Sequence, residues 1–257
     1  MDTIRSKFFF FPLAATILLF LILGSLSFAL SDPEIAGIQK SLRGKAVGER
    51  IASWAERFVG TPYDEDPQGL YVTRAAIVAD EKMDCMYLTF RSVELALSGA
   101  PEEAVQIALE KRFHTRGRLQ DGKVLNYEDR YQYGEDMVAS GKWGKEITAA
   151  LGPLKRIEGT RGKDHWKILP AKQIPGRLKR LKSGDLIFFI KDPKKRTVGE
   201  SVGHIGIVKV EEKAGRKSIY LIHASGSKNK GGAVRKVLLR DYVVKMPFVG
   251  VQVTRFQ

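Results

Sequence analysis

The chain has 257 residues, of which 44% are hydrophobic and 28% charged, with 25 Gly, 10 Pro and a single Cys. This length allows one large domain or two small ones, and the composition excludes a collagen, a coiled coil and a disordered chain. One Cys excludes an internal disulfide framework. The formal net charge is +14, from 43 Lys+Arg against 29 Asp+Glu.

The first segment is typical of an exported protein. Arg5 and Lys7 precede an apolar run over 8–23, and small residues follow it. This pattern predicts a secretory signal peptide over 1–29. The alternative is a retained membrane anchor, because the apolar stretch can be extended to Leu30 and is then long enough to span a bilayer. Either way we expect the remaining domain in the periplasm or cell envelope.

Residues 30–45 read as a linker, and helices follow it. Apolar spacing predicts a helix over 51–59 that ends at Gly60. A second helix is expected from the N-cap Asp84 to Gly99, and a third from Pro101. The segment 114–182 is rich in Gly, Pro and charge, and reads as short helices and loops.

From Gly184 the apolar period changes to that of strands. Five β-rich runs are separated by Gly, Lys or Pro; they are Asp185–Ile190, Gly203–Val210, Ser218–Ala224, Ala233–Leu239 and Phe248–Thr254. Helices first and strands later favour an α+β fold with an antiparallel sheet of about five strands.

Basic residues gather in the second half of the chain. They far outnumber acidic ones between Lys155 and Lys182, and a second cluster lies over 191–196. Outside the cytoplasm such a field favours an anionic wall polymer or a membrane surface. The alternative is a solvated surface without a dedicated partner. No nucleic-acid partner is expected, because no zinc-finger spacing and no basic motif interleaved with aromatic residues is present.

Cys85 is the first candidate for chemistry. It directly follows the N-cap Asp84, on the first turn of a predicted helix. Unpaired N–H groups at a helix start carry partial positive charge, so we expect them to lower the pKa of the thiol. A structural Cys would more naturally lie on the apolar stripe of the helix.

Two histidines are expected to meet near one another. A hairpin centred between residues 213 and 214, in the turn around Ala214-Gly215, pairs His204 with His223 on one face of the sheet. One imidazole can take the thiol proton of Cys85 while the other orients it, as in acyl-transfer enzymes.

Two other interpretations of this trio stay open. The histidines can form a structural polar pair, or Cys85 can join them as metal ligands. His114 and His165 lie in charged surroundings and read as surface residues.

Five short motifs resemble the NlpC-type papain-like cell-wall peptidase superfamily. They occur in the order of that superfamily, with the cysteine before the histidine as in its unpermuted branch. The resemblance covers residues 46–256, and the motifs are Gly60-Thr61-Pro62-Tyr63, Asp84-Cys85, Ser183-Gly184-Asp185-Leu186-Ile187-Phe188-Phe189, Gly203-His204-Ile205-Gly206-Ile207-Val208 and Leu221-Ile222-His223-Ala224-Ser225.

The long segment before Gly184 resembles the N-acetylmuramoyl-L-alanine amidase-like branch. The resemblance rests on 118–122 and on four later residues, Tyr127, Arg130, Tyr133 and Asp136. The chain departs from that branch at Leu119, Gln120, Gln132 and Met137.

The resemblance implies a single papain-like catalytic domain over 46–257 with an insertion at about 101–182. It implies Cys85 as nucleophile, His204 as general base and His223 as orienting residue, with no metal and no cofactor. Substrate contacts would come from the following residues: Tyr63, Asp84, Tyr127, Arg130 and Tyr133. For Asp84 we favour the helix cap over a contact with a substrate amine.

The implied activity is hydrolysis of an amide bond in peptidoglycan or muropeptides. An amidase would cut the lactyl–L-Ala bond, and an endopeptidase on the same scaffold would cut the γ-D-Glu–diamino acid bond. The alternative outside enzymes is an inactive wall-binding module that has kept the fold.

Overall fold

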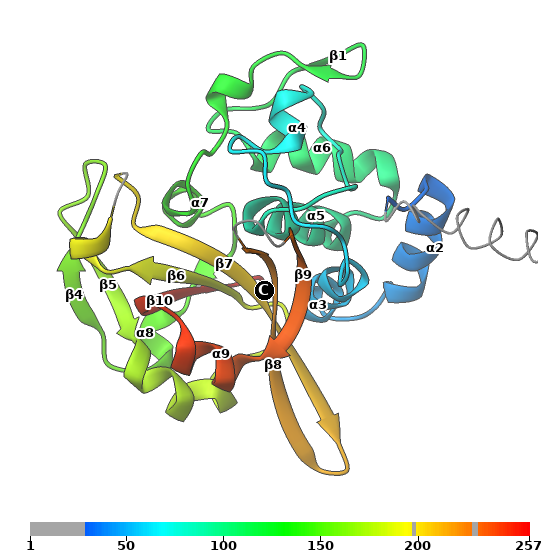
Figure 1. The fold of residues 1–257 in the computed structure, drawn as a ribbon. Coiled ribbons are helices and arrows are strands. Elements are labelled where there is room, and N and C mark those ends of the chain that lie inside the picture. The colour runs from blue at the N-terminus through cyan, green and yellow to red at the C-terminus, as the bar shows by residue number, and fades with distance from the viewer. Residues whose placement is uncertain (1–28, 197–198, 228–230) are drawn as a thin grey trace, which may run out of the picture.

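The protein is described by a computed structural model that covers residues 29–196, 199–227 and 231–257. The predicted signal peptide falls almost entirely on 1–28, outside the described residues. Among the described helices, none is long and apolar enough to cross a membrane. An antiparallel sheet runs through the middle of the molecule with helices on both faces (Figure 1). The α+β prediction is therefore confirmed, but the sheet has eight strands in the described residues where about five were expected.

Helices come first along the chain, as predicted. They are α2 (Asp32–Leu42), α3 (Val47–Arg57), α4 (Leu70–Thr73), α5 (Cys85–Leu97) and α6 (Pro101–Lys111). The linker predicted over 30–45 is wrong, since this segment forms α2. Ile35 and Leu42 are buried, and the Gln39 side chain donates a hydrogen bond to Ser98 Oγ at 2.7 Å. These contacts make α2 part of the folded domain.

The insertion over 101–182 contributes strands as well as helices. After α6 it contains β1 (Leu119–Gln120), β2 (Lys123–Val124), η1 (Tyr127–Asp129), α7 (Gly134–Ser140), β3 (Lys145–Glu146), α8 (Thr148–Leu151), β4 (Lys155–Glu158), β5 (His165–Pro170) and η2 (Ala171–Arg180). β3 and β5 pair with the last strand and β4 pairs with β5. These three strands explain the larger sheet. They are short or charged, so alternation of apolar residues could not reveal them.

All five predicted strands are present. They are β6 (Leu186–Lys191), β7 (Val202–Lys213), β8 (Arg216–Ser227), β9 (Gly231–Leu238) and β10 (Phe248–Arg255). The order across the sheet is β4-β5-β10-β6-β7-β8-β9, and β3 pairs with β10. A helix that was not predicted, α9 (Leu239–Lys245), connects β9 to β10. Figure 1 shows the far end of the β7–β8 hairpin projecting away from the body of the molecule.

The sheet separates two hydrophobic cores. In β6, Leu186, Phe188 and Ile190 pack with the side chains of α3 and α5. Ile187 and Phe189 point the other way and pack with α9 and η2. Because both faces are covered, β6 is a continuous apolar run rather than an alternating one.

A buried ionic network connects α5, the helix that carries Cys85, to the segments packed against it. Arg91 of α5 donates to both carboxylate oxygens of Asp80 at 2.8 Å. Arg112, at the end of α6, donates to both oxygens of Glu94 at 2.6 and 2.7 Å. All four side chains are almost fully buried. Pairing on this scale ties α5 to its neighbours by directional contacts as well as by apolar packing.

Candidate active site

Cys85 is the first residue of α5, and the preceding aspartate fixes that helix start. Asp84 has an extended backbone, and its Oδ1 accepts a hydrogen bond from the Tyr87 N–H at 2.6 Å. This is the geometry of an N-cap, so the capping role favoured for Asp84 is confirmed. The first turn thereby presents Cys85 at the end of the helix that faces the sheet.

The thiol lies against β7 where β7 and β8 part. The β7–β8 ladder runs from Lys213–Arg216 to Ile207–Ile222, and beyond that pair β8 continues along β9. The backbone N–H of Ile205, on β7 beyond the ladder, donates toward the Cys85 thiol. Cys85 is therefore placed one residue from His204 along β7, although the two are far apart in the sequence.

The two histidines are in direct contact. His204 Nε2 and His223 Nδ1 are 2.9 Å apart, and the ring planes cross at 87°. The expectation that these imidazoles would be neighbours is confirmed. Since His204 uses Nε2 for His223, its Nδ1 is the ring nitrogen left for another partner.

A β-bulge lies immediately before His204. In the β6–β7 pairing, Phe189 lies opposite His204 but Ile190 lies opposite Val202, so Gly203 is an extra residue. A bulge bends a strand and re-aims the adjacent side chain. A Cβ at position 203 would lie 2.8 Å from the Phe248 ring, so the close packing at this bulge needs glycine.

Aromatic rings surround the imidazole pair. The His204 ring is parallel to the Phe248 ring to within 6°, and its centroid lies 5.9 Å from that of Phe189. Tyr242 of α9 contacts both histidines, with its centroid 4.9 Å from that of His223. These rings restrict the imidazoles to one orientation. Sequence reasoning missed Tyr242, because α9 was not predicted.

The pKa of the thiol is shifted in the direction opposite to the prediction. Burial, and then the neighbouring Asp84 carboxylate, raise the pKa of Cys85 to about 12. The N–H groups of Ile205 and of Cys85 itself act in the other direction but do not outweigh these effects. The thiol of the free protein is therefore neutral near pH 7, and its proton must be removed by a base.

The histidines are neutral as well. Burial, and then the neighbouring His223, lower the pKa of His204 to about 3. Burial, and then the charge of Arg235, lower the pKa of His223 to about 4. Two neutral imidazoles beside a neutral thiol form a proton-transfer relay whose free imidazole nitrogen can act as a base.

Tyr63 lies beside this trio. Its ring packs over Gly226 and its Cβ lies against Gly232, and neither glycine has a side chain to block it. Burial raises the pKa of Tyr63 to about 12, and the neighbouring Cys85 is the next cause. Tyr63 therefore lies close to Cys85, and its predicted contact with a substrate stays a prediction.

Tyr127 is a core residue. Its hydroxyl donates to the Ala76 carbonyl at 2.5 Å, and its ring packs against Tyr71 and Phe113. With 8% of its surface exposed, it supports the fold, and the predicted substrate contact is not assigned to it.

Arg130 and Tyr133 contact other parts of the insertion. The Arg130 guanidinium donates to the Tyr127 carbonyl at 2.9 Å. The Tyr133 ring is covered by the Arg161 guanidinium, 4.1 Å from the ring centroid. Their predicted contact with a substrate stays a prediction.

The insertion contacts β7, the strand that carries His204, through a glutamate that sequence reasoning missed. Glu135 of α7 is buried, and its carboxylate accepts the N–H groups of Ser201 and Val202 at 2.9 and 3.2 Å. These residues directly precede the bulge and His204. Over the described residues, no group of three or more His, Cys, Asp or Glu is arranged to hold a metal ion.

The chain matches no protein-family model and no curated protein sequence. Its fold is similar to that of an N-acetylmuramoyl-L-alanine amidase from Bacteroides uniformis, with 20% identity, a TM-score of 0.61, and 81% of this chain and 98% of that chain covered. A candidate xylanase from Bacteroides fragilis is 21% identical, with a TM-score of 0.59 over 80% and 100% of the two chains.

A protein of the DUF1460 family from Legionella pneumophila str. Philadelphia 1 is also similar, with 14% identity, a TM-score of 0.65, and 86% and 93% of the chains covered. These similarities show a shared fold. Different activities are attached to the similar proteins, so the fold does not by itself identify the substrate.

Proposed function

We propose that this protein is an exported cysteine amidohydrolase that cleaves an amide bond of peptidoglycan or its muropeptide fragments, without metal or cofactor. The observation that carries the proposal is the convergence of three residues from separate elements. Cys85 at the start of α5 faces the Ile205 N–H, and the adjacent His204 is 2.9 Å from His223. The similarity in fold to an N-acetylmuramoyl-L-alanine amidase from Bacteroides uniformis supports the choice of substrate.

The first half of the reaction forms a thioester. His204 donates its Nε2–H to His223 Nδ1, so its Nδ1 carries the lone pair that takes the Cys85 thiol proton as sulfur attacks the amide carbonyl. The Asp84 cap engages the N–H groups of Met86 and Tyr87, which leaves the Cys85 N–H to stabilise the oxyanion. His204 then returns the proton to the leaving amine, and the C–N bond breaks.

The second half restores the enzyme. His204 Nδ1 takes a proton from water as the water oxygen attacks the thioester carbonyl. The C–S bond breaks, and the proton passes to the Cys85 sulfur. The products are a carboxylic acid and a free amine, so the cycle needs no oxidant or reductant.

Purified muropeptides incubated with wild type and Cys85→Ala, followed by mass spectrometry, test the proposal. We expect products from wild type alone. A free peptide and a free muramic-type sugar identify the amidase, whereas a disaccharide dipeptide identifies the D-glutamyl–diamino acid endopeptidase. If neither protein releases product while both bind cell-wall sacculi, the inactive binding module is correct.

Export is proposed from the N-terminal sequence pattern. Fractionation of cells that express the whole chain tests it. An envelope protein shortened by the first 29 residues is expected for a cleaved signal, and a full-length membrane-bound protein for a retained anchor. Recovery from the cytoplasm alone would contradict export.

A further inference from the structure

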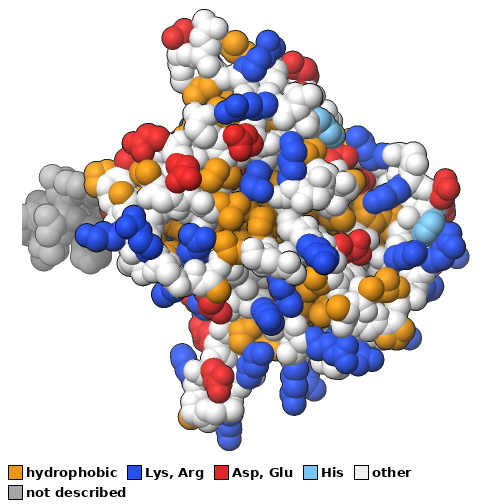
Figure 2. Space-filling view, turned by 180° about the vertical axis from the view of Figure 1, so that it is seen from behind, with side chains coloured by type: hydrophobic (Ala, Val, Ile, Leu, Met, Phe, Trp, Pro, Cys, Tyr) orange, Lys and Arg blue, Asp and Glu red, His pale blue; other side chains and the backbone are white. Residues whose placement is uncertain are grey.

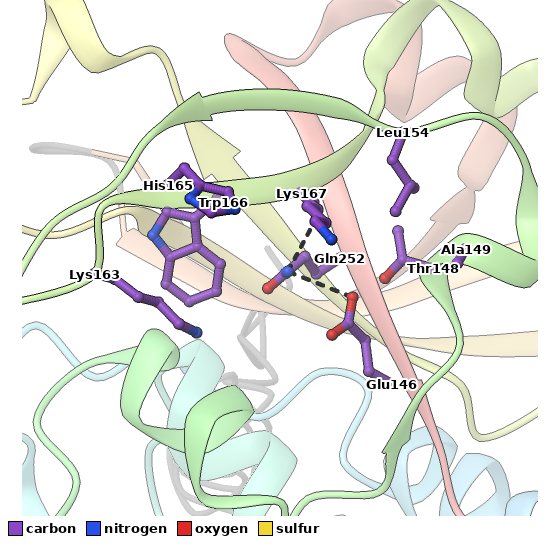
Figure 3. A pocket seen from close by; sticks show the side chains of 9 residues that line it. All are labelled: Glu146, Thr148, Ala149, Leu154, Lys163, His165, Trp166, Lys167 and Gln252. Carbon is purple, nitrogen blue, oxygen red and sulfur yellow. Dashed lines mark hydrogen bonds between the residues drawn. The ribbon is translucent and has the colours of Figure 1, made fainter.

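A cavity of about 400 Å³ lies among β3, β5, α8 and β10, and its residues are not part of the Cys85 site. We name it the Gln252 cavity. Ligand pockets are commonly of this volume. The lining residues, shown in Figure 3, are Glu146, Thr148, Ala149, Leu154, Lys163, His165, Trp166, Lys167 and Gln252.

The cavity contains a buried acceptor that lacks a donor. Gln252 is 4% exposed, and its amide nitrogen donates to the Lys167 carbonyl at 3.1 Å and to Glu146 Oε1 at 3.5 Å. These two bonds fix which end of the amide is oxygen. That oxygen has no hydrogen-bond partner among the described residues. In Figure 3 it points toward the side where Trp166 and Lys163 lie.

Burying an acceptor without a donor costs free energy, so the geometry favours a ligand that supplies the donor.

The remaining lining residues show what else the ligand must offer. Lys163 and Lys167 are exposed donors, and the Lys163 ammonium lies 3.9 Å from the centroid of the Trp166 ring. Glu146 is an exposed acceptor, while Leu154 and Ala149 are apolar. The ligand therefore needs closely spaced donors and acceptors beside a small apolar group.

We propose that the Gln252 cavity binds an N-acylated sugar ring. A sugar hydroxyl donates and accepts at one oxygen, so it can donate to Gln252 Oε1 and accept from the Lys163 ammonium at once. The acyl methyl matches the apolar side of the lining. A peptide backbone separates its donors and acceptors along the chain, and fits this arrangement less well. The inference rests on the proposed function for the choice of sugar, because a muropeptide contains such rings.

Nuclear magnetic resonance of the full chain carrying Cys85→Ala tests the proposal without turnover. The probe is N,N′-diacetylchitobiose, and the reporter is the assigned indole N–H of Trp166, with that of Trp54 in α3 as the internal control. We expect a saturable shift of Trp166 and none of Trp54. Cellobiose, which lacks the acyl groups, should bind at least about tenfold more weakly, a difference of about 1.4 kcal/mol.

Two variants locate the contact. Gln252→Met and Lys163→Met should each weaken binding of N,N′-diacetylchitobiose by about tenfold, while Lys179→Met, an exposed basic residue of η2, should leave it unchanged. Lys163 is exposed, so its variant keeps the test valid if Gln252→Met fails to fold.

Absence of a saturable Trp166 shift overturns the proposal. So does equal binding by the variants, equal binding by cellobiose, or a Trp166 shift caused instead by a muropeptide-type tripeptide. Sugar binding by a protein whose wild type releases no product from muropeptides would overturn the amidase and leave this site standing.

Discussion

His204 and His223 touch although their backbone positions are not opposite one another. Their ring nitrogens are 2.9 Å apart, yet one step beyond the last β7–β8 pair, Ile207–Ile222, would set His223 against Gly206. The side chains therefore meet on a diagonal, across strands that have begun to part. In the proposed mechanism, β7 supplies the base, His204, and β8 supplies the residue that orients it, His223.

The first prediction follows from that division of roles. His204→Asn should lower kcat/KM on muropeptides by about 10³, because it removes the proton acceptor. His223→Leu should lower kcat/KM by about 10². His223→Asn should lower it less, because the Asn carbonyl can still accept the His204 Nε2–H. Product formation followed by chromatography gives the rates. The matched control is His114→Asn at an exposed position, and a loss of activity there, or no difference between Leu and Asn at 223, would contradict the relay.

The second prediction concerns the resting thiol. Burial raises the pKa of Cys85 to about 12, so iodoacetamide should alkylate the free protein more slowly than a small thiol at about pH 8, where an ordinary cysteine is partly ionised. The rate should keep rising through about pH 10. His204→Asn should change it little, since no imidazolium holds a thiolate. A rate plateau near neutral pH that disappears in His204→Asn would show an ion pair instead.

The shared face of His204 and His223 was predictable because side chains alternate between the two faces of a strand, so a pairing error of two residues does not change the face. The hairpin was expected to be centred between 213 and 214, whereas the turn lies at Ala214-Gly215, both with positive φ. A shift of one residue in the turn centre moves the pairing by two, which returns every side chain to its original face. The face of His204 and His223 was thus correct even though the register was not.

Other features depend on contacts that no local pattern records. The start of the Cys85 helix could be predicted from Asp84 and the apolar stripe that follows it, and the cap is as expected. The direction of the Cys85 pKa shift could not be predicted, because desolvation depends on packing from other elements, including α9. Tyr242 lies in a segment without the length or period of a recognisable helix. β3 is too short to carry a period at all.

The third prediction is that stability falls as the pH drops from about 6.5 to about 4. The folded-state pKa values of His204 and His223 are lowered to about 3 and about 4, so the unfolded chain takes up protons in this window that the folded chain does not. Asp84 acts in the opposite sense, because burial raises its folded-state pKa to about 6 and the folded chain then binds the extra proton. Because two histidines destabilise the fold in this window and one aspartate stabilises it, we expect a net loss of folding free energy as the pH drops.

Denaturant unfolding over this pH range measures the balance. Asp84→Asn keeps an effective helix cap and removes the opposing carboxyl group, so its stability should fall more steeply than that of wild type as the pH drops. A double variant with Gln at 204 and 223 should show a shallower fall. Parallel curves for wild type and Asp84→Asn would mean that Asp84 does not titrate as its burial implies.

The fourth prediction tests the bulge before His204. Gly203→Ala would place a methyl 2.8 Å from the Phe248 ring and closer still to the Lys191 side chain. Overpacking of this kind costs about 1–3 kcal/mol of stability. Because Phe248 stacks on His204, activity should fall further than the stability loss explains. Gly37→Ala in α2, where a methyl meets nothing within 4 Å, is the control and should leave activity intact.

The fifth prediction separates the buried ionic network from ordinary surface pairs. Arg112→Met would leave the Glu94 carboxylate buried beside Arg91 with one partner removed, and loss of a buried partner costs about 3–5 kcal/mol. Arg116→Met, which breaks an exposed pair with Glu110 at 3.6 Å, should cost less than about 1 kcal/mol. Urea unfolding midpoints compare the two variants.

Since Glu94 lies on the helix that begins at Cys85, Arg112→Met should also slow muropeptide cleavage at temperatures where the variant is fully folded. Equal costs for the two variants would mean that the network does not hold α5 in place.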